Sequence, residues 1–161
     1  MGQEIERKFL VRKEIWQNQA KEGQVYRQGY LNSTKERTVR VRIANNKGYL
    51  TVKGLSRGAT RLEFEYEIPV EDAEKLLDLC ERPLIEKTRF KIEHGDFIWE
   101  VDEFFGENEG LFLAEIELDS EEQTFSKPDW LAEEVTDDPR YFNANLVQHP
   151  FSEWGDTEAQ A

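Results

Sequence analysis

The chain has 161 residues, 34% of them charged, and a formal net charge of -13 at pH 7. Its length fits a single domain whose core can fold without disulfides, and the lone Cys80 excludes an internal disulfide. The excess of acids argues against nonspecific nucleic-acid binding, because that affinity comes from neutralised phosphates. No apolar run approaches the roughly 20 residues needed to cross a bilayer, and the N-terminus has no apolar leader. We therefore expect a cytoplasmic protein that binds neither nucleic acid nor membrane.

Alternating charged and apolar residues predict most of the strands. Over residues 4–11, Glu4, Glu6 and Lys8 share one face and apolar residues share the other, because successive side chains of a strand point to opposite faces. The same pattern returns over residues 37–43, 60–70, 84–93, 97–104 and 111–119. Residues 24–31 and 49–53 also alternate, so we expect about eight strands.

Helical spacing is confined to short segments. Residues 13–20 predict a surface helix, and residues 71–80 predict an amphipathic helix that needs an apolar face of the sheet to cover. Residues 129–134 and 139–148 also have a helical pattern. We expect a single domain over residues 1–150, followed by a flexible acidic tail over residues 151–161.

These strands are joined mostly by hairpins and predict one antiparallel sheet, whose edges would disappear if the sheet closed. Ordinary small barrels fill the lumen with apolar side chains, whereas here one shared face carries many charges. Its bases are Lys8, Arg40, Arg42, Lys53, Lys87 and Arg89, and its acids are Glu4, Glu6, Glu63, Glu65, Asp102, Glu115 and Glu117. Because unpaired buried charges are costly, we expect a hydrated lumen that pairs them with each other or with a ligand. The alternative is a solvated face on an open sheet.

A cavity that combines many bases with many carboxylates suits a polyphosphate carried with a divalent metal ion. Arg and Lys bind phosphate oxygens, Arg often through two parallel hydrogen bonds. Carboxylates at alternate positions of a strand converge on one hard cation, and Mg²⁺ or Mn²⁺ prefers oxygen ligands while keeping bound waters. One such water can become the nucleophile.

The motif Glu4-Ile5-Glu6-Arg7-Lys8 resembles the ExExK signature of the CYTH, or triphosphate tunnel metalloenzyme, superfamily. The resemblance covers residues 3–148, and its further motifs are Arg27-Gln28-Gly29-Tyr30-Leu31, Arg40-Val41-Arg42, Thr51-Val52-Lys53, Arg61-Leu62-Glu63-Phe64-Glu65, Glu86-Lys87-Thr88-Arg89, Glu100-Val101-Asp102, Glu115-Ile116-Glu117, and Glu134-Val135-Thr136 with Arg140-Tyr141. It implies an α+β, mainly β fold: a closed eight-stranded antiparallel tunnel barrel with flanking surface helices and a C-terminal helix that can plug one entrance. The chain is most similar to the short bacterial stand-alone members, which are typically inorganic triphosphatases.

Carried over position by position, the resemblance implies roles for the residues of the lumen. Glu4, Glu6, Asp102, Glu115 and Glu117 would hold Mg²⁺ or Mn²⁺. Lys8, Arg40, Arg42, Lys53, Lys87 and Arg89 would bind the triphosphate. Catalysis would involve Glu4, Glu6, Lys8 and Tyr30, although a purely structural role for Tyr30 stays open. Glu63 and Glu65 would support the lumen, either by binding metal or by orienting the bases.

We therefore expect metal-dependent hydrolysis of inorganic triphosphate to diphosphate and phosphate. One alternative is a class IV-type adenylate cyclase or a hydrolase of an organic triphosphate such as thiamine triphosphate or a nucleotide. Another is a non-catalytic module that binds polyphosphate. A homodimer is left open, and we expect no chemical role for His94, His149 or Cys80.

Overall fold

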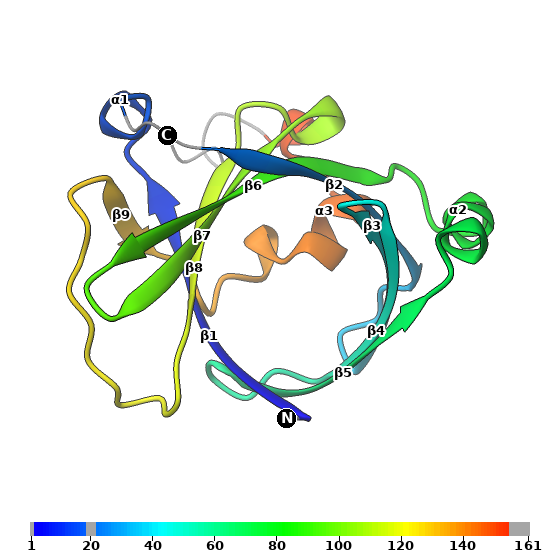
Figure 1. The fold of residues 1–161 in the computed structure, drawn as a ribbon, viewed down its shortest axis with the longest axis horizontal. Coiled ribbons are helices and arrows are strands. Elements are labelled where there is room, and N and C mark those ends of the chain that lie inside the picture. Colours follow the sequence, from blue (N-terminus) through cyan, green and yellow to red (C-terminus); the bar gives the residue numbers. More distant parts are fainter. Residues whose placement is uncertain (1, 19–21, 155–161) are drawn as a thin grey trace.

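Eight strands close into a ring in the computed structural model, which describes residues 2–18 and 22–154 (Figure 1). Going round the ring, the strands are β1 (Gln3–Val11), β8 (Phe112–Glu117), β7 (Phe97–Phe104), β6 (Ile85–His94), β2 (Gly23–Asn32), β3 (Arg37–Ala44), β4 (Lys47–Gly54) and β5 (Thr60–Ile68). All neighbouring pairs are antiparallel. The predicted closed antiparallel barrel is confirmed.

Strand β1 closes the barrel by pairing with two strands in succession. Its first residues pair with β5, where Glu4 lies opposite Arg61, and its later residues pair with β8, where Glu6 lies opposite Glu117 and Lys8 opposite Glu115. Because alternate residues of a strand share a face, this register brings the charged faces of β1, β5 and β8 to the same side, inside the ring.

The segment predicted as a helix over residues 129–134 is instead a strand, β9 (Leu131–Glu134), so that prediction was wrong. It pairs with the end of β1, where Phe9 faces Glu134 and Val11 faces Leu131, beyond the residues of β1 that pair with β5. The backbone groups of β1 would otherwise lack partners there, and an unpaired buried strand edge is costly. Tertiary pairing has therefore overridden a short helical pattern.

The helices are short and lie outside or across the barrel. Helix α1 (Lys13–Trp16) is the start of the predicted helix 13–20, whose last two residues lie outside the described ranges. Helix α2 (Val70–Asp78) covers β3 and β4 as expected, burying Ala73 and Leu77 against Val41. The outward side chains of β5, Leu62, Phe64 and Tyr66, stay exposed. Within the described residues, the longest helix is too short and too polar to cross a membrane.

The C-terminal segment lies across one end of the barrel. It contains η2 (Pro139–Tyr141), α3 (Asn143–Gln148) and η3 (Phe151–Glu153), and a further 3-10 turn, η1 (Gly106–Asn108), contacts η3. Figure 1 shows α3 inside the outline of the ring when the molecule is viewed down the barrel. Tyr141, Leu146 and Trp154 are buried in one cluster with Leu10 and other strand residues. Residues 151–154 of the expected tail therefore belong to the packed fold, and residues 155–161 lie outside the described ranges.

Candidate functional site

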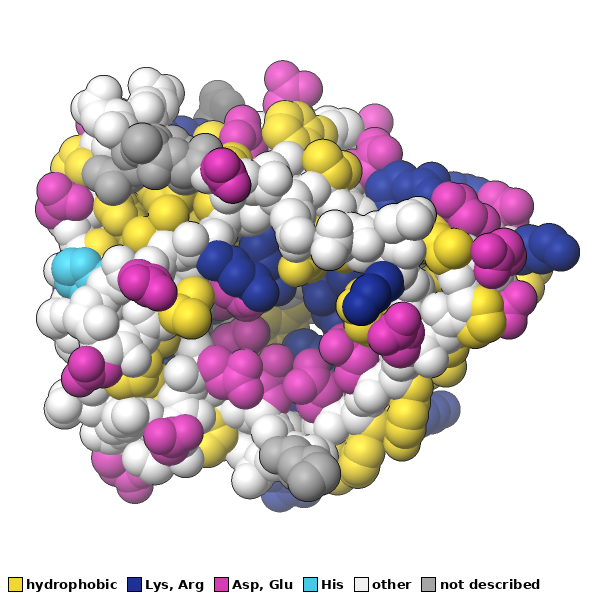
Figure 2. All heavy atoms as spheres, viewed as in Figure 1, with side chains coloured by type: hydrophobic (Ala, Val, Ile, Leu, Met, Phe, Trp, Pro, Cys, Tyr) yellow, Lys and Arg dark blue, Asp and Glu magenta, His cyan; other side chains and the backbone are white. Residues whose placement is uncertain are grey.

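The lumen of the barrel is a cavity of about 890 Å³ lined mainly by charged and polar side chains. Looking into this hollow, Figure 2 shows acidic side chains along one side of the rim and Lys and Arg side chains along the other. The lumen-facing residues predicted from the sequence line it, with the exception of Asp102: Glu4, Glu6, Lys8, Tyr30, Arg40, Arg42, Lys53, Glu63, Glu65, Lys87, Arg89, Glu115 and Glu117. The structure thus brings together thirteen side chains from across the sequence in one enclosed space.

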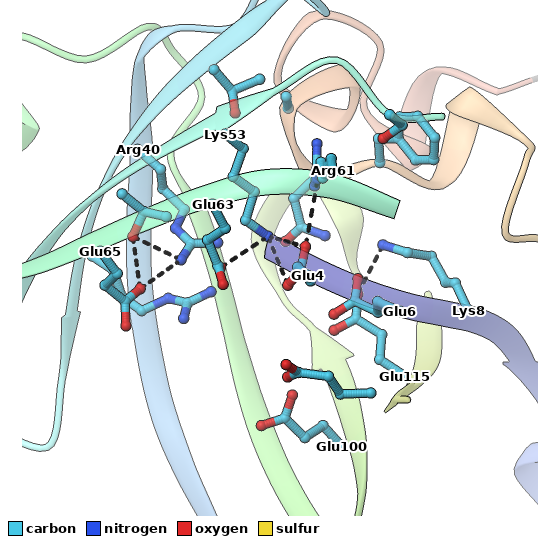
Figure 3. A pocket seen from close by; sticks show the side chains of 18 of the residues that line it. Glu4, Glu6, Lys8, Arg40, Lys53, Arg61, Glu63, Glu65, Glu100 and Glu115 are labelled. Carbon is cyan, nitrogen blue, oxygen red and sulfur yellow. Dashed lines mark hydrogen bonds and ion pairs between the residues drawn. The ribbon is translucent and has the colours of Figure 1, made fainter. Parts of the chain in front are cut away.

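Most of the lumen acids are already paired with bases, Glu4 and Glu115 with more than one each (Figure 3). Glu4 accepts hydrogen bonds from Lys53 Nζ at 3.1 and 3.3 Å, and Arg61 lies 3.5 Å away. Glu115 lies 2.9 Å from Lys8 Nζ and 3.2 Å from an Arg89 nitrogen. The pKa of the Glu115 carboxyl is held well below its usual value because these cations outweigh the effect of burial.

Two other acids, Glu6 and Glu117, form no ion pair with any described residue. Burial and the neighbouring carboxylates Glu115 and Glu4 raise the pKa of Glu6 to about 8. Burial and the carboxylates of Glu4, Glu63 and Glu100 also raise the pKa of Glu117. A pKa that neighbouring acids raise marks a place where positive charge is lacking. This part of the lumen therefore favours a bound cation.

The opposite wall presents guanidinium groups with free donors. Arg40 donates one terminal N–H to Thr51 Oγ1 at 3.1 Å and to Glu65 at 3.3 Å, but its buried Nε has no partner. Arg42 donates Nε to Gln28 Oε1 at 2.8 Å. Burial and the nearby Arg40 and Arg89 lower the pKa of Arg42 to about 9. Such crowded cations with unused donors favour an anionic ligand.

Asp102, unlike the other predicted metal ligands, does not line the cavity. It is 2% exposed, and both carboxylate oxygens accept hydrogen bonds from Arg89, at 2.8 and 2.9 Å. The second oxygen also accepts from Lys87 Nζ at 2.8 Å. These cations lower the pKa of Asp102 to about 2, whereas burial and the neighbouring Arg89 and Arg42 lower that of Lys87 to about 7. The structure thus places Asp102 as the counterion that fixes Lys87 and Arg89.

The C-terminal segment supplies two acceptors that face the lumen bases. Lys8 Nζ lies 3.4 Å from the backbone oxygen of Tyr141, and Lys87 Nζ donates to Asn143 Oδ1 at 3.0 Å. Tyr30, for which sequence reasoning left two roles open, lines the same end of the cavity and packs in the core cluster that contains Tyr141.

Sequence reasoning left several lumen residues out of the predicted site, among them Arg61, Glu100 and Asn143. Arg61 and Glu100 line the cavity, and the strand alternation that identified Glu63 and Asp102 already places them on the same face. Asn143 has no such signal, because it lies on a short helix whose position against the barrel depends on tertiary packing.

The donor set of the lumen suits a hard divalent cation, since it consists of carboxylates on adjacent strands. Among the described residues, however, no group of three or more His, Cys, Asp or Glu side chains is arranged to hold a metal ion as it stands. The ion pairs of Glu4 and Glu115 agree with this finding, because a carboxylate turned to a base is not free for metal. A ligand that draws these bases to itself would free both acids: Lys53 and Arg61 for Glu4, Lys8 and Arg89 for Glu115.

Comparison with known proteins agrees with this geometry. The CYTH domain family matches residues 2–150. The chain is 58% identical over 152 residues to an inorganic triphosphatase of Acetivibrio thermocellus, with 94% of this chain and 97% of the relative covered. It is 38% identical to an inorganic triphosphatase of Nitrosomonas europaea, with 89% and 96% covered. The crystal structure of the inorganic triphosphatase NE1496 superposes with a TM-score of 0.65 at 35% identity, covering 89% of this chain and 96% of that one. The chain therefore belongs to the CYTH domain family.

Proposed function

We propose that this protein is an inorganic triphosphatase, which hydrolyses a terminal phosphoanhydride of tripolyphosphate and releases diphosphate and phosphate. One observation carries the proposal: the closed lumen sets bases with unused donors, Arg40 and Arg42, against unpaired acids, Glu6 and Glu117. A linear polyphosphate accompanied by a metal ion suits both sets of side chains, because the phosphates accept hydrogen bonds from the arginines and the metal ion binds the carboxylates. The two relatives named inorganic triphosphatase support the choice of substrate.

Triphosphatases of the CYTH family typically depend on a metal ion. Here Glu4, Glu6, Glu115 and Glu117 would hold it, and the oxygen-only donor set favours Mg²⁺ or Mn²⁺. When bound, such an ion polarises phosphoryl oxygens and makes water more acidic.

The bases of the lumen bind and orient the substrate. The guanidinium groups of Arg40 and Arg42 lie on one strand, two residues apart, and Lys8, Lys53, Lys87 and Arg89 face the same space. In the transition state of phosphoryl transfer, negative charge develops on the leaving diphosphate oxygen and is spread over the oxygens of the transferring group, so fixed cations in an enclosed site lower the barrier. The walls also exclude bulk water from the reacting centre.

One aromatic ring of the lumen is already occupied. Of the aromatic residues that line the cavity, Tyr26 contacts two guanidinium groups, with Arg42 4.7 Å and Arg89 5.1 Å from the ring centroid. Those contacts occupy the ring that could otherwise stack on a base. The phosphates should therefore supply nearly all of the binding energy.

The test is phosphate release from tripolyphosphate, ATP, thiamine triphosphate and diphosphate, each at fixed free Mg²⁺ and then Mn²⁺. We expect kcat/KM for tripolyphosphate to exceed that for ATP, and diphosphate to be a very poor substrate because it spans fewer of the bases. A ratio below one would show that the nucleoside is recognised, and formation of cyclic AMP would identify a cyclase. Tight binding without turnover would identify a non-catalytic polyphosphate-binding module.

A further inference from the structure

The side chain of Asn143 lies between two strands that carry lumen bases. It stands at the first residue of α3, where the C-terminal segment meets β2 and β6. Its Oδ1 atom accepts two hydrogen bonds, from Lys87 Nζ and from Gln28 Nε2, both at 3.0 Å. One amide oxygen thus links the C-terminal segment to two strands of the barrel.

The bond to Lys87 limits how its ammonium group can turn. Lys87 is 1% exposed and also donates to Asp102 at 2.8 Å. An ammonium group has three N–H donors, so two fixed acceptors determine the direction of the third. Without Asn143, Asp102 would be the one hydrogen-bond acceptor left to the group among the described residues, and the ammonium could rotate about that single bond.

The bond to Gln28 extends the effect to a second base. Gln28 is fully buried, and its Oε1 accepts from Arg42 Nε at 2.8 Å. Because the two ends of the Gln28 amide are bonded to Asn143 and to Arg42, the amide cannot flip without losing both contacts. Arg42 is thereby held through Nε, which leaves the terminal nitrogens of its guanidinium for a ligand.

We propose that Asn143 is a positioning residue for the triphosphate: it orients Lys87 directly and Arg42 through Gln28. This inference rests on the proposed function, because it takes these two bases as triphosphate ligands. Asn143 itself need not touch the substrate. Without Asn143, the ligand itself would have to order both bases when it binds. This ordering costs free energy that the wild-type protein does not lose on binding, so the variant should bind triphosphate more weakly.

The experiment compares Asn143→Ala with Asn145→Ala, a change of the same residue type in the same helix. The Asn145 amide donates to Pro139 O within the C-terminal segment, and the structure records no bond from it to a lumen base. Two quantities are measured: Kd for tripolyphosphate by calorimetry in the presence of EDTA, and KM with kcat at saturating Mg²⁺. Circular dichroism and Tm give the folded fraction of each variant.

For Asn143→Ala we expect Kd and KM to rise about tenfold, the loss typical of a hydrogen bond to a charged group, whereas Asn145→Ala should stay within about twofold of the wild type. A merely structural role would lower kcat with the folded fraction and leave KM and Kd unchanged. The loss of binding in the double variant Gln28→Leu/Asn143→Ala should be smaller than the sum of the two single losses, because both residues act on Arg42 through the Gln28 amide. If Asn143→Ala does not fold, Asn143→Ser decides by the same measurements, since its hydroxyl is too short to bridge both donors.

The outcomes separate this inference from the proposed function. Unchanged Kd and KM in a folded Asn143 variant overturn the inference while leaving the function in place. A wild-type protein that binds tripolyphosphate but does not hydrolyse it refutes the proposed function, and Kd still decides the role of Asn143. A wild-type protein that neither binds nor hydrolyses it overturns both.

Discussion

Replacing Asp102 with Asn tests whether this acid fixes two lumen bases or holds a metal ion. Asn has nearly the same shape but carries no charge, so Lys87 and Arg89 would lose the counterion that contacts them at 2.8 to 2.9 Å. The shift of the Asp102 pKa from 3.8 to about 2 corresponds to about 2 kcal/mol of favourable interaction. Leaving partner charges buried and unpaired adds to this, and such losses typically reach about 3–5 kcal/mol. For a chain of this length we expect Tm to fall by about 6–20 °C.

The assay is urea unfolding followed by circular dichroism at pH 7, together with activity as a function of Mg²⁺ concentration. The matched control is Glu100→Gln on the same strand, because Glu100 makes one contact with Arg89, at 3.2 Å, and is partly exposed. We expect the control to lose less than about 1 kcal/mol. Asp102→Asn should lower activity without changing the Mg²⁺ concentration that gives half of its maximum, since the bases rather than the metal are displaced.

The pH dependence of stability adds a second signature. The pKa of Asp102 is lowered in the folded state, so its contribution is present above the unfolded pKa near 4 and is lost as the pH falls toward 2. Between pH 4 and pH 2 the Asn variant should therefore lose less stability than the wild type. An unfolding free energy within 1 kcal/mol of the wild type, combined with a higher Mg²⁺ requirement, would refute the counterion role and restore Asp102 as a metal ligand.

Three further outcomes follow from the site and the core. Glu117→Gln should raise the Mg²⁺ requirement at least tenfold while leaving stability unchanged or higher, because it removes a carboxylate crowded by other acids; an unchanged Mg²⁺ titration contradicts its role. Arg42→Ala should raise KM and lower kcat, with kcat/KM falling by roughly one to two orders of magnitude, and wild-type constants exclude it from the site. Burial raises the pKa of Cys80 to about 11, so its reaction with iodoacetamide at pH 8 should be far slower than after unfolding in urea, and equal rates show that this thiol is accessible.

The barrel could be predicted from the sequence because its signal is local and repeated. Each strand alternates with a period of two, and once β1 is placed between β5 and β8, the faces that carry Glu4, Lys8 and Glu115 are fixed on one side. The charges of the lumen are also what allowed it to be predicted. A charged face that is repeated over many strands is difficult to explain as solvent exposure alone.

The features that escaped prediction depend on contacts between distant parts of the chain. Strand β9 exists because β1 has a free edge beyond its pairing with β5, which no pattern within residues 129–134 reveals. Asp102 shares the periodicity of the lumen acids, yet its depth behind Arg89 sets it apart from Glu115. Alternation reports the face of a side chain but not its depth, so it cannot separate counterions from groups that are free to bind.

Some lumen acids are paired with bases and others are not, and this difference affects whether the substrate would enter as a free anion or as a metal complex. Ion pairs with Lys53, Lys8 and Arg89 neutralise Glu4, Glu115 and Asp102 before any ligand binds. Glu6 and Glu117, which form no ion pair with a described residue, would repel a bare polyphosphate, and the net charge of -13 adds to the repulsion outside the lumen. A metal complex of the same polyphosphate carries less negative charge and offers a cation to the unpaired acids. Under the proposed function, the lumen is therefore built to accept the metal complex in preference to the free anion.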